Sequence, residues 1–463
     1  MANRFHVVLI PGFGGFDALG QVEYYAGVTR LFQAWKDERP VVLHYFDNFP
    51  TAAVVTRATR LRRYLAKRIA RGEIAEGDEV ALVGHSTGGL DIRQLLSDVS
   101  DLHVPAHDAV QVDGGWRVPA GTIRERVRRV VFLSVPHWGT NIADWVHAHP
   151  VWRKALVADL QAAAAGSQVY LFDRIEEQVA GGAASLTGAE MLLAAQDALT
   201  EANACFGKPS PMRTADAQEA ASALGLWLRH MASDFHVIDD LTSQPPDRGP
   251  RSPAHFSTVA RETELEHFDN IEVLSYATLG RRPFAFVAGQ PAPDWDLANP
   301  CTLREIAFEG KLSAGTDIAY RLCYRACAGG PFRQPPLKLN GGVDWRLIGS
   351  RGDPIELWDN DGIVNTASML WPGVANVLVD CDHLDIAGHY QLTKAAPGAG
   401  RKYQSYDALK SGSRFSNERF ETIWTEIFDF CAGGKVPPPR GERRSSKSGR
   451  KTTVRPAPAA VEA

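Results

Sequence analysis

Short apolar runs alternate with amphipathic stretches along much of the chain. The strand-like runs are Phe5 to Ile10, Val41 to Phe46, Val80 to Val83, Val130 to Val135, residues 270 to 280 and Val374 to Asp380. Apolar residues recur at helical spacing over residues 52–70, directly after Ser86, and from Asn417 to Cys431. Strands that alternate with helices predict an α/β protein with a mostly parallel sheet and helices on both of its faces.

Two long excursions interrupt this alternation. Residues 140–240 lack a strand signal, and their apolar residues recur at helical spacing, which predicts a large helical cap inserted into the sheet. The segment 281–355 is rich in Pro and Gly and is predicted to be irregular, as are residues 98–122. The predicted organisation is a core formed by residues 1–139 and 241–431, with the cap 140–240 inserted between its two parts and a tail at 432–463.

The charge distribution separates the tail from the rest. From residue 432 onward there are eight Lys and Arg against two Glu, so the remaining residues carry a net charge of −10 within the −4 of the whole chain. A Pro-, Ser- and Arg-rich segment of this kind cannot bury a core and is predicted to be disordered. Attachment to nucleic acid or to an anionic surface is the alternative, but no aromatic residues are present to stack on bases, so no nucleic-acid partner is expected.

Composition is that of an ordinary globular chain, with 44% hydrophobic and 22% charged residues among 463. No apolar run approaches the ~20 residues of a membrane-spanning helix. The first residues enter a strand at once without the pattern of a signal peptide, which predicts a cytoplasmic protein unless a leader has been removed from a secreted one. Six cysteines are too sparse for a disulfide framework, although Cys323 and Cys327 could form one bridge.

The segment Gly84-His85-Ser86-Thr87-Gly88 has the pattern G-x-S-x-G between a strand-like run and a helical pattern. A nucleophile elbow needs this arrangement, because a strained turn between strand and helix leaves no room for Cβ atoms beside the serine. A glycine-rich turn that binds an anion at a helix N-terminus is the alternative. The context favours Ser86 as the nucleophile.

A serine nucleophile needs a base, and the base needs an acid that fixes its tautomer. In chain order Ser, acid, His, the sequence offers Asp359 or Asp361 and then His383 or His389. Asp361 precedes Gly362 in a tight turn, and His383 follows the last strand closely, so we expect these two to complete the triad. Each alone is equally typical of a turn or a loop; together and in this order they indicate catalysis.

Two backbone N–H groups are the expected oxyanion donors. Thr87 follows the nucleophile at the start of its helix, and Phe13 lies in the glycine-rich "PGFGG" loop after the first strand. A loop of this kind could also cradle phosphate, but it lacks the lysine of a P-loop and the spacing of a dinucleotide fingerprint.

Several short blocks resemble the bacterial triacylglycerol lipases. "VVLIPGFGGF" is similar to their oxyanion segment, with Pro11 where they usually have histidine, and "GHSTGG" to their elbow. "SVPHWGT" and "SYATLG" resemble two of their strand ends, and "NDGIVNTASM" and "DHLDIAG" the acid and histidine segments of the thermoalkalophilic lipases. The resemblance implies an α/β-hydrolase fold and carboxylic-ester hydrolysis by Ser86, Asp361 and His383.

The chain also departs from that family. The zinc-binding lipases have histidines in an insertion shortly before the elbow, whereas residues 71–79 contain none, so we expect no zinc. Asp385 matches one calcium-ligand position of the family, but Tyr390 stands where another carboxylate would be. Asp385 is therefore only a weak calcium candidate, and no cofactor is expected.

The sequence thus predicts a lipase or esterase that acts on an ester or lipid substrate. An acyltransferase or amidase with the same triad is one alternative, and a non-catalytic binding protein of the same fold is another. The cap is predicted to cover Ser86 and to make contact with lipid interfaces, with some of Val169, Phe172, Ile175 and Val179 facing the acyl pocket. A rigid structural domain far from the site is the alternative. The sequence leaves the oligomeric state open.

Overall fold

The structure is a computed structural model of the chain. It describes residues 3–15, 18–19, 22–35, 39–100, 109–111, 117–148, 234–243, 265–282, 318–328, 345–348, 355–356, 358–371, 374, 376–390, 409, 411–413 and 415–435. Most of the predicted tail, from residue 436 onward, and most of the predicted cap, including Val169, Phe172, Ile175 and Val179, lie outside these residues.

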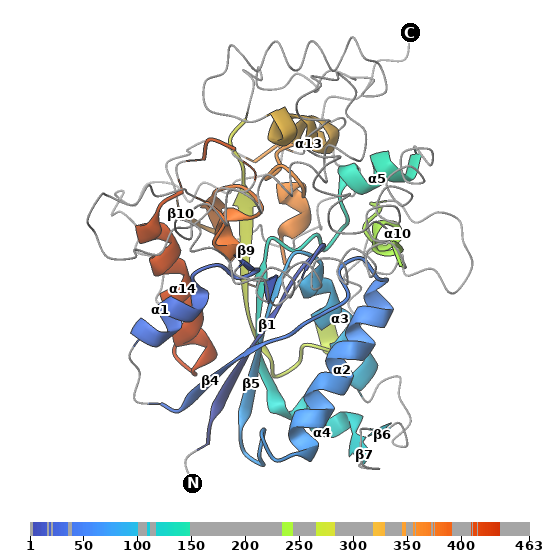
Figure 1. Ribbon diagram of the computed structural model, residues 1–463, viewed down its shortest axis with the longest axis vertical. Coiled ribbons are helices and arrows are strands. Elements are labelled where there is room, and N and C mark those ends of the chain that lie inside the picture. Colours follow the sequence, from blue (N-terminus) through green and yellow to red (C-terminus); the bar gives the residue numbers. More distant parts are fainter. Residues whose placement is uncertain are drawn as a thin grey trace, which may run out of the picture.

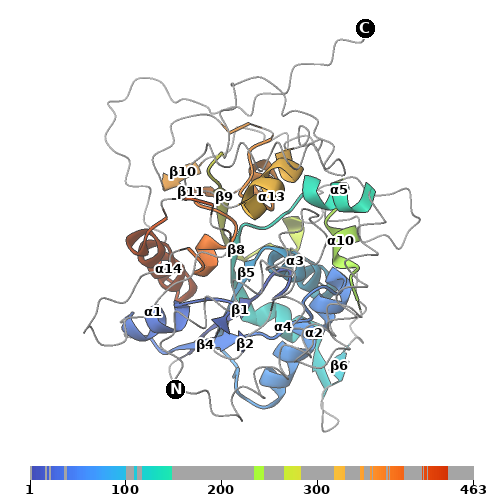
Figure 2. The ribbon, with the colours of Figure 1, turned by 45° about the horizontal axis from the view of Figure 1, so that its top comes forward.

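A seven-stranded parallel sheet is the centre of the described part, in the order β10-β11-β9-β8-β5-β1-β4. Figure 2 lets the reader follow this order from one edge of the sheet to the other. Its strands are β1 (Phe5–Ile10), β4 (Val41–Tyr45), β5 (Glu79–His85), β8 (Val127–Leu133), β9 (Glu272–Leu279), β10 (Trp345–Ile348) and β11 (Asn376–Asp380).

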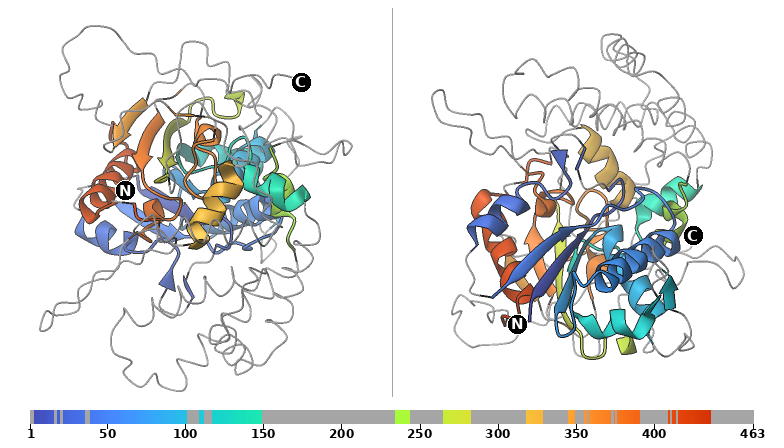
Figure 3. Two further views of the ribbon diagram at one scale, coloured as in Figure 1. Left: turned by 90° about the horizontal axis from the view of Figure 1, so that it is seen from above. Right: turned by 60° about the horizontal axis from the view of Figure 1, so that its bottom comes forward.

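Helices cover both faces of this sheet (Figures 1 and 3). One face carries α2 (Val54–Ala70), α3 (Thr87–Val99) and α4 (Ala120–Arg126), and the other carries α1 (Val28–Ala34) and α14 (Asn417–Cys431). Side chains of β1 alternate between the two, because Val8 and Ile10 pack with the first group and Val7 and Leu9 with the second. A strand that is buried on both faces has a continuous run of apolar residues, and the sequence of β1 has this pattern.

The parallel sheet, its two helical layers and the strand–turn–helix from β5 to α3 together make this an α/β-hydrolase fold, as the sequence predicted. The predicted strands and helices of the core agree with the observed ones to within a few residues. The carboxyl ends of the parallel strands meet at one edge, where an open α/β sheet places its active site.

Two segments differ from the sequence-based prediction. Within residues 98–122, predicted as loop, the chain forms a hairpin of β6 (Ala109–Gln111) and β7 (Arg117–Pro119) and begins α4. Within 281–355, predicted as irregular, it forms α13 (Ile318–Ala328) and the sheet-edge strand β10. These elements are short, so local apolar periodicity gives them little signal, and pairing with a neighbour determines their conformation. A second small hairpin, of β2 (Ala18–Leu19) and β3 (Val22–Glu23), follows β1.

The two described ends of the predicted cap lie side by side. The N–H of Thr140 donates to the carbonyl of Leu241 at 2.9 Å, and helices α5 (Asn141–Ala148) and α10 (Val237–Asp240) contact each other. The returning segment also touches the core, because Asp240 accepts a hydrogen bond from the N–H of Val54 at the start of α2, at 2.7 Å. The chain therefore leaves the sheet after β8 and returns beside the point at which it left.

None of the described helices is long and apolar enough to cross a membrane. Cys323, Cys327, Cys381 and Cys431 are free thiols, so the possible bridge between Cys323 and Cys327 is not formed.

His137, just after β8, is a buried histidine in an aromatic environment. Its ring lies 4.7 Å from that of Phe132 and 4.8 Å from that of Trp371, and neither ring nitrogen has a hydrogen-bond partner among the described residues. Burial, and secondarily the charge of Arg93, holds the pKa of His137 well below its ordinary value of 6.5. The folded protein therefore keeps this imidazole neutral at a pH where the unfolded chain protonates it.

The substitution His137→Leu is expected to weaken the acid dependence of stability. Below the unfolded-state pKa of about 6.5, the unfolded chain binds one more proton at this residue, so the unfolding free energy falls as the pH falls, by about 1.4 kcal/mol per pH unit. Urea unfolding of both proteins at pH 7.5, 6.0 and 5.0 measures the difference. The unfolding free energy of the variant, relative to that of the wild type, should increase toward pH 5.0. If the unfolding free energies of the two proteins change in parallel with pH, folding does not change the protonation of His137.

Candidate active site

Ser86 occupies a strained turn between β5 and α3. Its φ of 53° and ψ of −127° lie in a region that L residues rarely adopt, and it is buried. The flanking glycines are required by close packing: a Cβ on Gly84 would lie 2.6 Å from the N of Gly89, and one on Gly88 would lie 2.4 Å from the carbonyl oxygen of Ile10. The backbone therefore has the geometry that a nucleophile elbow requires.

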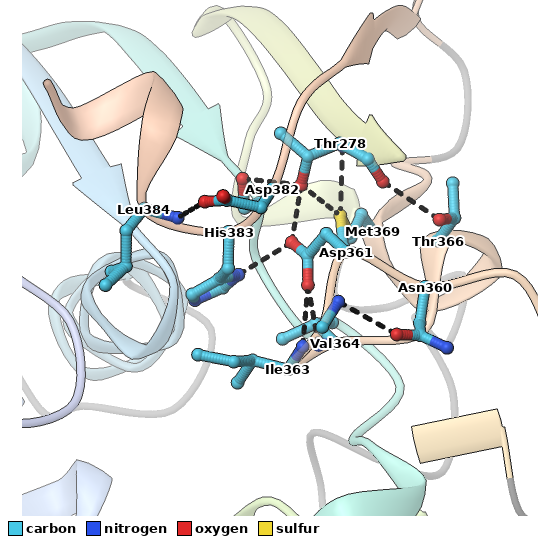
Figure 4. Close-up of polar contacts among 12 residues, drawn as sticks. Thr278, Asn360, Asp361, Ile363, Val364, Thr366, Met369, Asp382, His383 and Leu384 are labelled. Carbon is cyan, nitrogen blue, oxygen red and sulfur yellow. Dashed lines mark hydrogen bonds and ion pairs between the residues drawn. The ribbon is translucent and has the colours of Figure 1, made fainter. Parts of the chain in front are cut away.

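Asp361 lies beside His383, and Figure 4 shows the pair with its neighbours. The His383 Nδ1 is 2.7 Å from the Asp361 Oδ2, which also accepts a hydrogen bond from the hydroxyl of Thr278 at 2.5 Å. The other carboxylate oxygen accepts from the backbone N–H groups of Ile363 and Val364, at 3.0 and 2.8 Å. With four donors and no exposed surface, the carboxylate is held in one orientation toward the imidazole.

The other two candidates for acid and base have different partners. Asp359 forms a two-pronged ion pair with Arg282, with its Oδ1 2.9 Å from Nε and its Oδ2 3.0 Å from a terminal nitrogen. The Nε2 of His389 lies 2.8 Å from the backbone carbonyl of Tyr24. Among the predicted candidates, the structure brings together Asp361 and His383.

His85, at the end of β5, contacts the loop that carries His383. Its Nε2 is 2.8 Å from the backbone carbonyl of His383, and the two imidazole rings have their centroids 4.7 Å apart. Ser86 is the next residue after His85, so the elbow and the loop that carries His383 are directly adjacent.

The loop after β1 reaches Ser86 from the other side. A Cβ on Gly12 would lie 2.6 Å from the Cβ of Ser86, so only glycine allows the backbone to approach this closely. Phe13 follows Gly12 and is partly exposed, with its ring edge-on to that of Phe235. Thr87 is the first residue of α3, where backbone N–H groups have no partner within the helix. Both predicted oxyanion donors thus belong to residues that adjoin Ser86 or Gly12.

A buried ion pair contacts the backbone of the loop after β1. Arg57 of α2 and Asp91 of α3 are both fully buried, with a guanidinium nitrogen 2.9 Å from the Asp91 Oδ2. The same guanidinium donates to the backbone carbonyls of Pro11 and Gly12 at 2.9 and 3.3 Å. Burial raises the pKa of Asp91 to about 6, and the positive charge of Arg57 opposes that rise. The pair therefore connects two helices to the loop that precedes Phe13.

The sequence-based reasoning did not identify Arg57, Asp91, Tyr24 or Thr278. Arg57 lies on a helix of ordinary amphipathic pattern, in which an arginine is normally exposed. The partners of Thr278 and Tyr24 lie far away in the sequence, so no local pattern marks them.

Asp385, the weak calcium candidate, is part of a hydrogen-bonded loop. Its Oδ2 accepts from the N–H of Asp382 at 2.9 Å and from the hydroxyl of Ser413 at 2.6 Å. Within the described part of the chain, no three His, Cys, Asp or Glu side chains are grouped so that they could hold a metal ion.

No protein-family model and no curated protein sequence matches the chain. Among solved structures, it is similar to a lipase of Staphylococcus hyicus, with 15% identity, a TM-score of 0.43, and coverage of 93% of this chain and 95% of that one. It is also similar to lipase 1 of Pelosinus fermentans, with 15% identity, a TM-score of 0.36, and coverage of 92% and 98%. A metagenomic carboxyl esterase gives 13% identity, a TM-score of 0.37, and coverage of 93% and 76%. The strand order of the sheet and the strand–turn–helix around Ser86 define the fold independently of these likenesses.

Proposed function

We propose that the protein is a serine carboxylic-ester hydrolase of the lipase or esterase type. The observation that carries the proposal is the 2.7 Å contact between Asp361 and His383, in a loop that adjoins the strained turn of Ser86. A buried acid that orients an imidazole beside a strained serine is the arrangement that activates a hydroxyl for attack on a carbonyl.

The proposed reaction runs through an acyl-enzyme. Ser86 Oγ attacks the ester carbonyl, and His383 Nε2 takes the proton of the hydroxyl. The same proton then goes to the leaving alcohol as the carbon–oxygen bond of the ester breaks. Water, deprotonated by His383, then attacks the acyl carbon. The bond from that carbon to Ser86 Oγ breaks, His383 returns the proton to Oγ, and the carboxylic acid leaves.

Asp361 has two roles in the proposed mechanism. Its hydrogen bond to Nδ1–H leaves the Nε2 of His383 free to accept a proton, and its negative charge stabilises the imidazolium that then forms. The backbone N–H groups of Phe13 and Thr87 stabilise the negative charge that develops on the carbonyl oxygen of the substrate.

Labelling with a fluorophosphonate tests the proposal directly. This reagent phosphonylates serine hydroxyls that a neighbouring base activates, so we expect one phosphonyl group on Ser86, located by mass spectrometry of the digested protein, with parallel loss of hydrolysis of short p-nitrophenyl esters. Unreactive Ser86 in folded protein, or label at another serine with loss of activity, would refute the assignment. Faster turnover of amides, or transfer of the acyl group to an added alcohol in preference to water, would indicate an amidase or acyltransferase instead.

A further inference from the structure

A chain of three buried hydrogen bonds joins the oxyanion loop to the catalytic histidine. The N–H of Gly12 donates to the hydroxyl oxygen of Tyr24 at 2.8 Å, and that oxygen lies 2.6 Å from the Nδ1 of His85. The Nε2 of His85 lies 2.8 Å from the backbone carbonyl of His383. The chain therefore connects the loop after β1, the strand end before Ser86 and the loop after β11.

With Tyr24 and His85 both neutral, the donors and acceptors of this chain fit one arrangement of protons. The carbonyl of His383 can only accept, so the Nε2 of His85 must carry a proton. The N–H of Gly12 can only donate, so the hydroxyl of Tyr24 accepts there and gives its own proton to the Nδ1 of His85. In this arrangement His85 is a neutral imidazole and Tyr24 a neutral phenol.

Burial maintains those neutral forms. It holds the pKa of His85 well below the ordinary value, with the nearby His383 acting in the same direction, and it raises the pKa of Tyr24 above its ordinary value. A neutral His85 also avoids repulsion, because its ring lies against that of His383, which becomes positively charged during ester hydrolysis.

We propose that Tyr24 and His85 are positioning residues that set the distance between the oxyanion loop and the general base. The inference rests on the proposed function, since it needs Phe13 N–H to bind the oxyanion and His383 to take the proton of Ser86. Gly12 immediately precedes Phe13, and the carbonyl that His85 holds belongs to His383 itself. A displacement of about 1 Å in a catalytic group can reduce the rate on the order of 100-fold, so a chain that fixes both groups affects the reaction without touching the substrate.

Tyr24→Phe tests this role, with Tyr25→Phe as the matched control. Tyr25 is also a buried tyrosine, but its hydroxyl donates to the carbonyl of Ile10, on β1 rather than in the oxyanion loop, at 2.6 Å. We expect Tyr24→Phe to lower kcat about 10- to 100-fold with KM changed less than about threefold. Tyr25→Phe should keep kcat within about threefold while losing similar thermal stability.

Two substitutions of His85 test the same role in graded steps, and they remain informative if the Tyr24→Phe protein does not fold. His85→Gln retains a nitrogen donor toward the His383 carbonyl but loses the acceptor for Tyr24, whereas His85→Leu loses both. We expect kcat to decrease from wild type to His85→Gln to His85→Leu at matched fractions of folded protein.

The possible outcomes separate this inference from the proposed function. If the wild type hydrolyses esters and its Ser86 reacts with a fluorophosphonate, but Tyr24→Phe and both His85 variants have the kcat of Tyr25→Phe, the positioning role is wrong and the function stands. If the wild type neither hydrolyses esters nor reacts with a fluorophosphonate at Ser86, the proposed function is wrong, and so is the positioning role that rests on it. Equal losses in kcat for Tyr24→Phe and Tyr25→Phe would reduce both to general structural effects and overturn the inference.

Discussion

Ser86→Ala is expected to abolish ester hydrolysis and to leave the fold intact. The substitution removes the oxygen that carries the acyl group in the proposed mechanism, and losses on the order of 10⁴- to 10⁶-fold in kcat are typical of nucleophile knockouts. Alanine keeps the Cβ, so the positive φ of 53° and its strain are the same in both proteins. Turnover of a short p-nitrophenyl ester gives the effect on catalysis, and urea unfolding gives the effect on stability.

Ser134→Ala is a matched control for that experiment. Ser134 is also a fully buried serine at the end of a parallel strand, and its φ of 52° is nearly that of Ser86. Its hydroxyl lies 2.9 Å from that of Thr278, so its loss should reduce kcat by less than about tenfold. An active Ser86→Ala protein, or equal losses in the two variants, would show that Ser86 is not the nucleophile.

The features that the sequence predicted well are those that depend on near neighbours in the chain. The elbow is recognisable because glycines, a strand-like run and a helical pattern all lie within about twenty residues of Ser86. The long strands of the sheet were predictable because burial on both faces requires a continuous apolar run. Ser86, Asp361 and His383 could be proposed together because the triads of α/β-hydrolases follow the chain order serine, acid, histidine.

The features that escaped prediction depend on contacts between distant segments. Arg57 and Asp91 are charged residues on amphipathic helices, and only the packing of α2 against α3 buries them as a pair. Tyr24 and His85 are 61 residues apart, and Thr278 and Asp361 are 83 apart, so no local periodicity connects them. The four residues of β10 give no strand signal of their own, and pairing with β11 places them at the edge of the sheet.

The choice between Asp359 and Asp361 shows the same limit at the scale of two residues. The sequence favoured Asp361 on the ground that a following glycine makes a tight turn, and Gly362 does adopt a positive φ of 99°. The sequence could not show that Arg282 contacts both oxygens of Asp359, since that arginine lies just after β9, far away in the sequence. An arginine that neutralises one carboxylate leaves the other to orient the histidine.

Asp361→Asn is expected to lower kcat by about 10⁴-fold, because it reverses the hydrogen bond to His383. The backbone N–H groups of Ile363 and Val364 donate to one side chain oxygen, so an amide there would keep its oxygen toward them and turn its NH₂ toward the imidazole. An NH₂ group must donate to the Nδ1 of His383, which places the remaining ring proton on Nε2. That nitrogen can then no longer accept the proton of Ser86.

Asp359→Asn is the matched control for this last experiment. It changes a buried aspartate two residues away in the same loop, and it weakens the ion pair with Arg282 without touching His383. We expect reduced stability in urea and a kcat within a few-fold of wild type, whereas Asp361→Asn should lose activity with the protein still folded. The imidazole ¹⁵N chemical shifts of His383 provide an independent check: its Nδ1 should be protonated in the wild type and in Asp359→Asn, and unprotonated in Asp361→Asn. A large loss of kcat in Asp359→Asn with Asp361→Asn nearly normal would transfer the role of the acid to Asp359, and an unchanged Nδ1 proton in an inactive Asp361→Asn protein would refute the tautomer explanation.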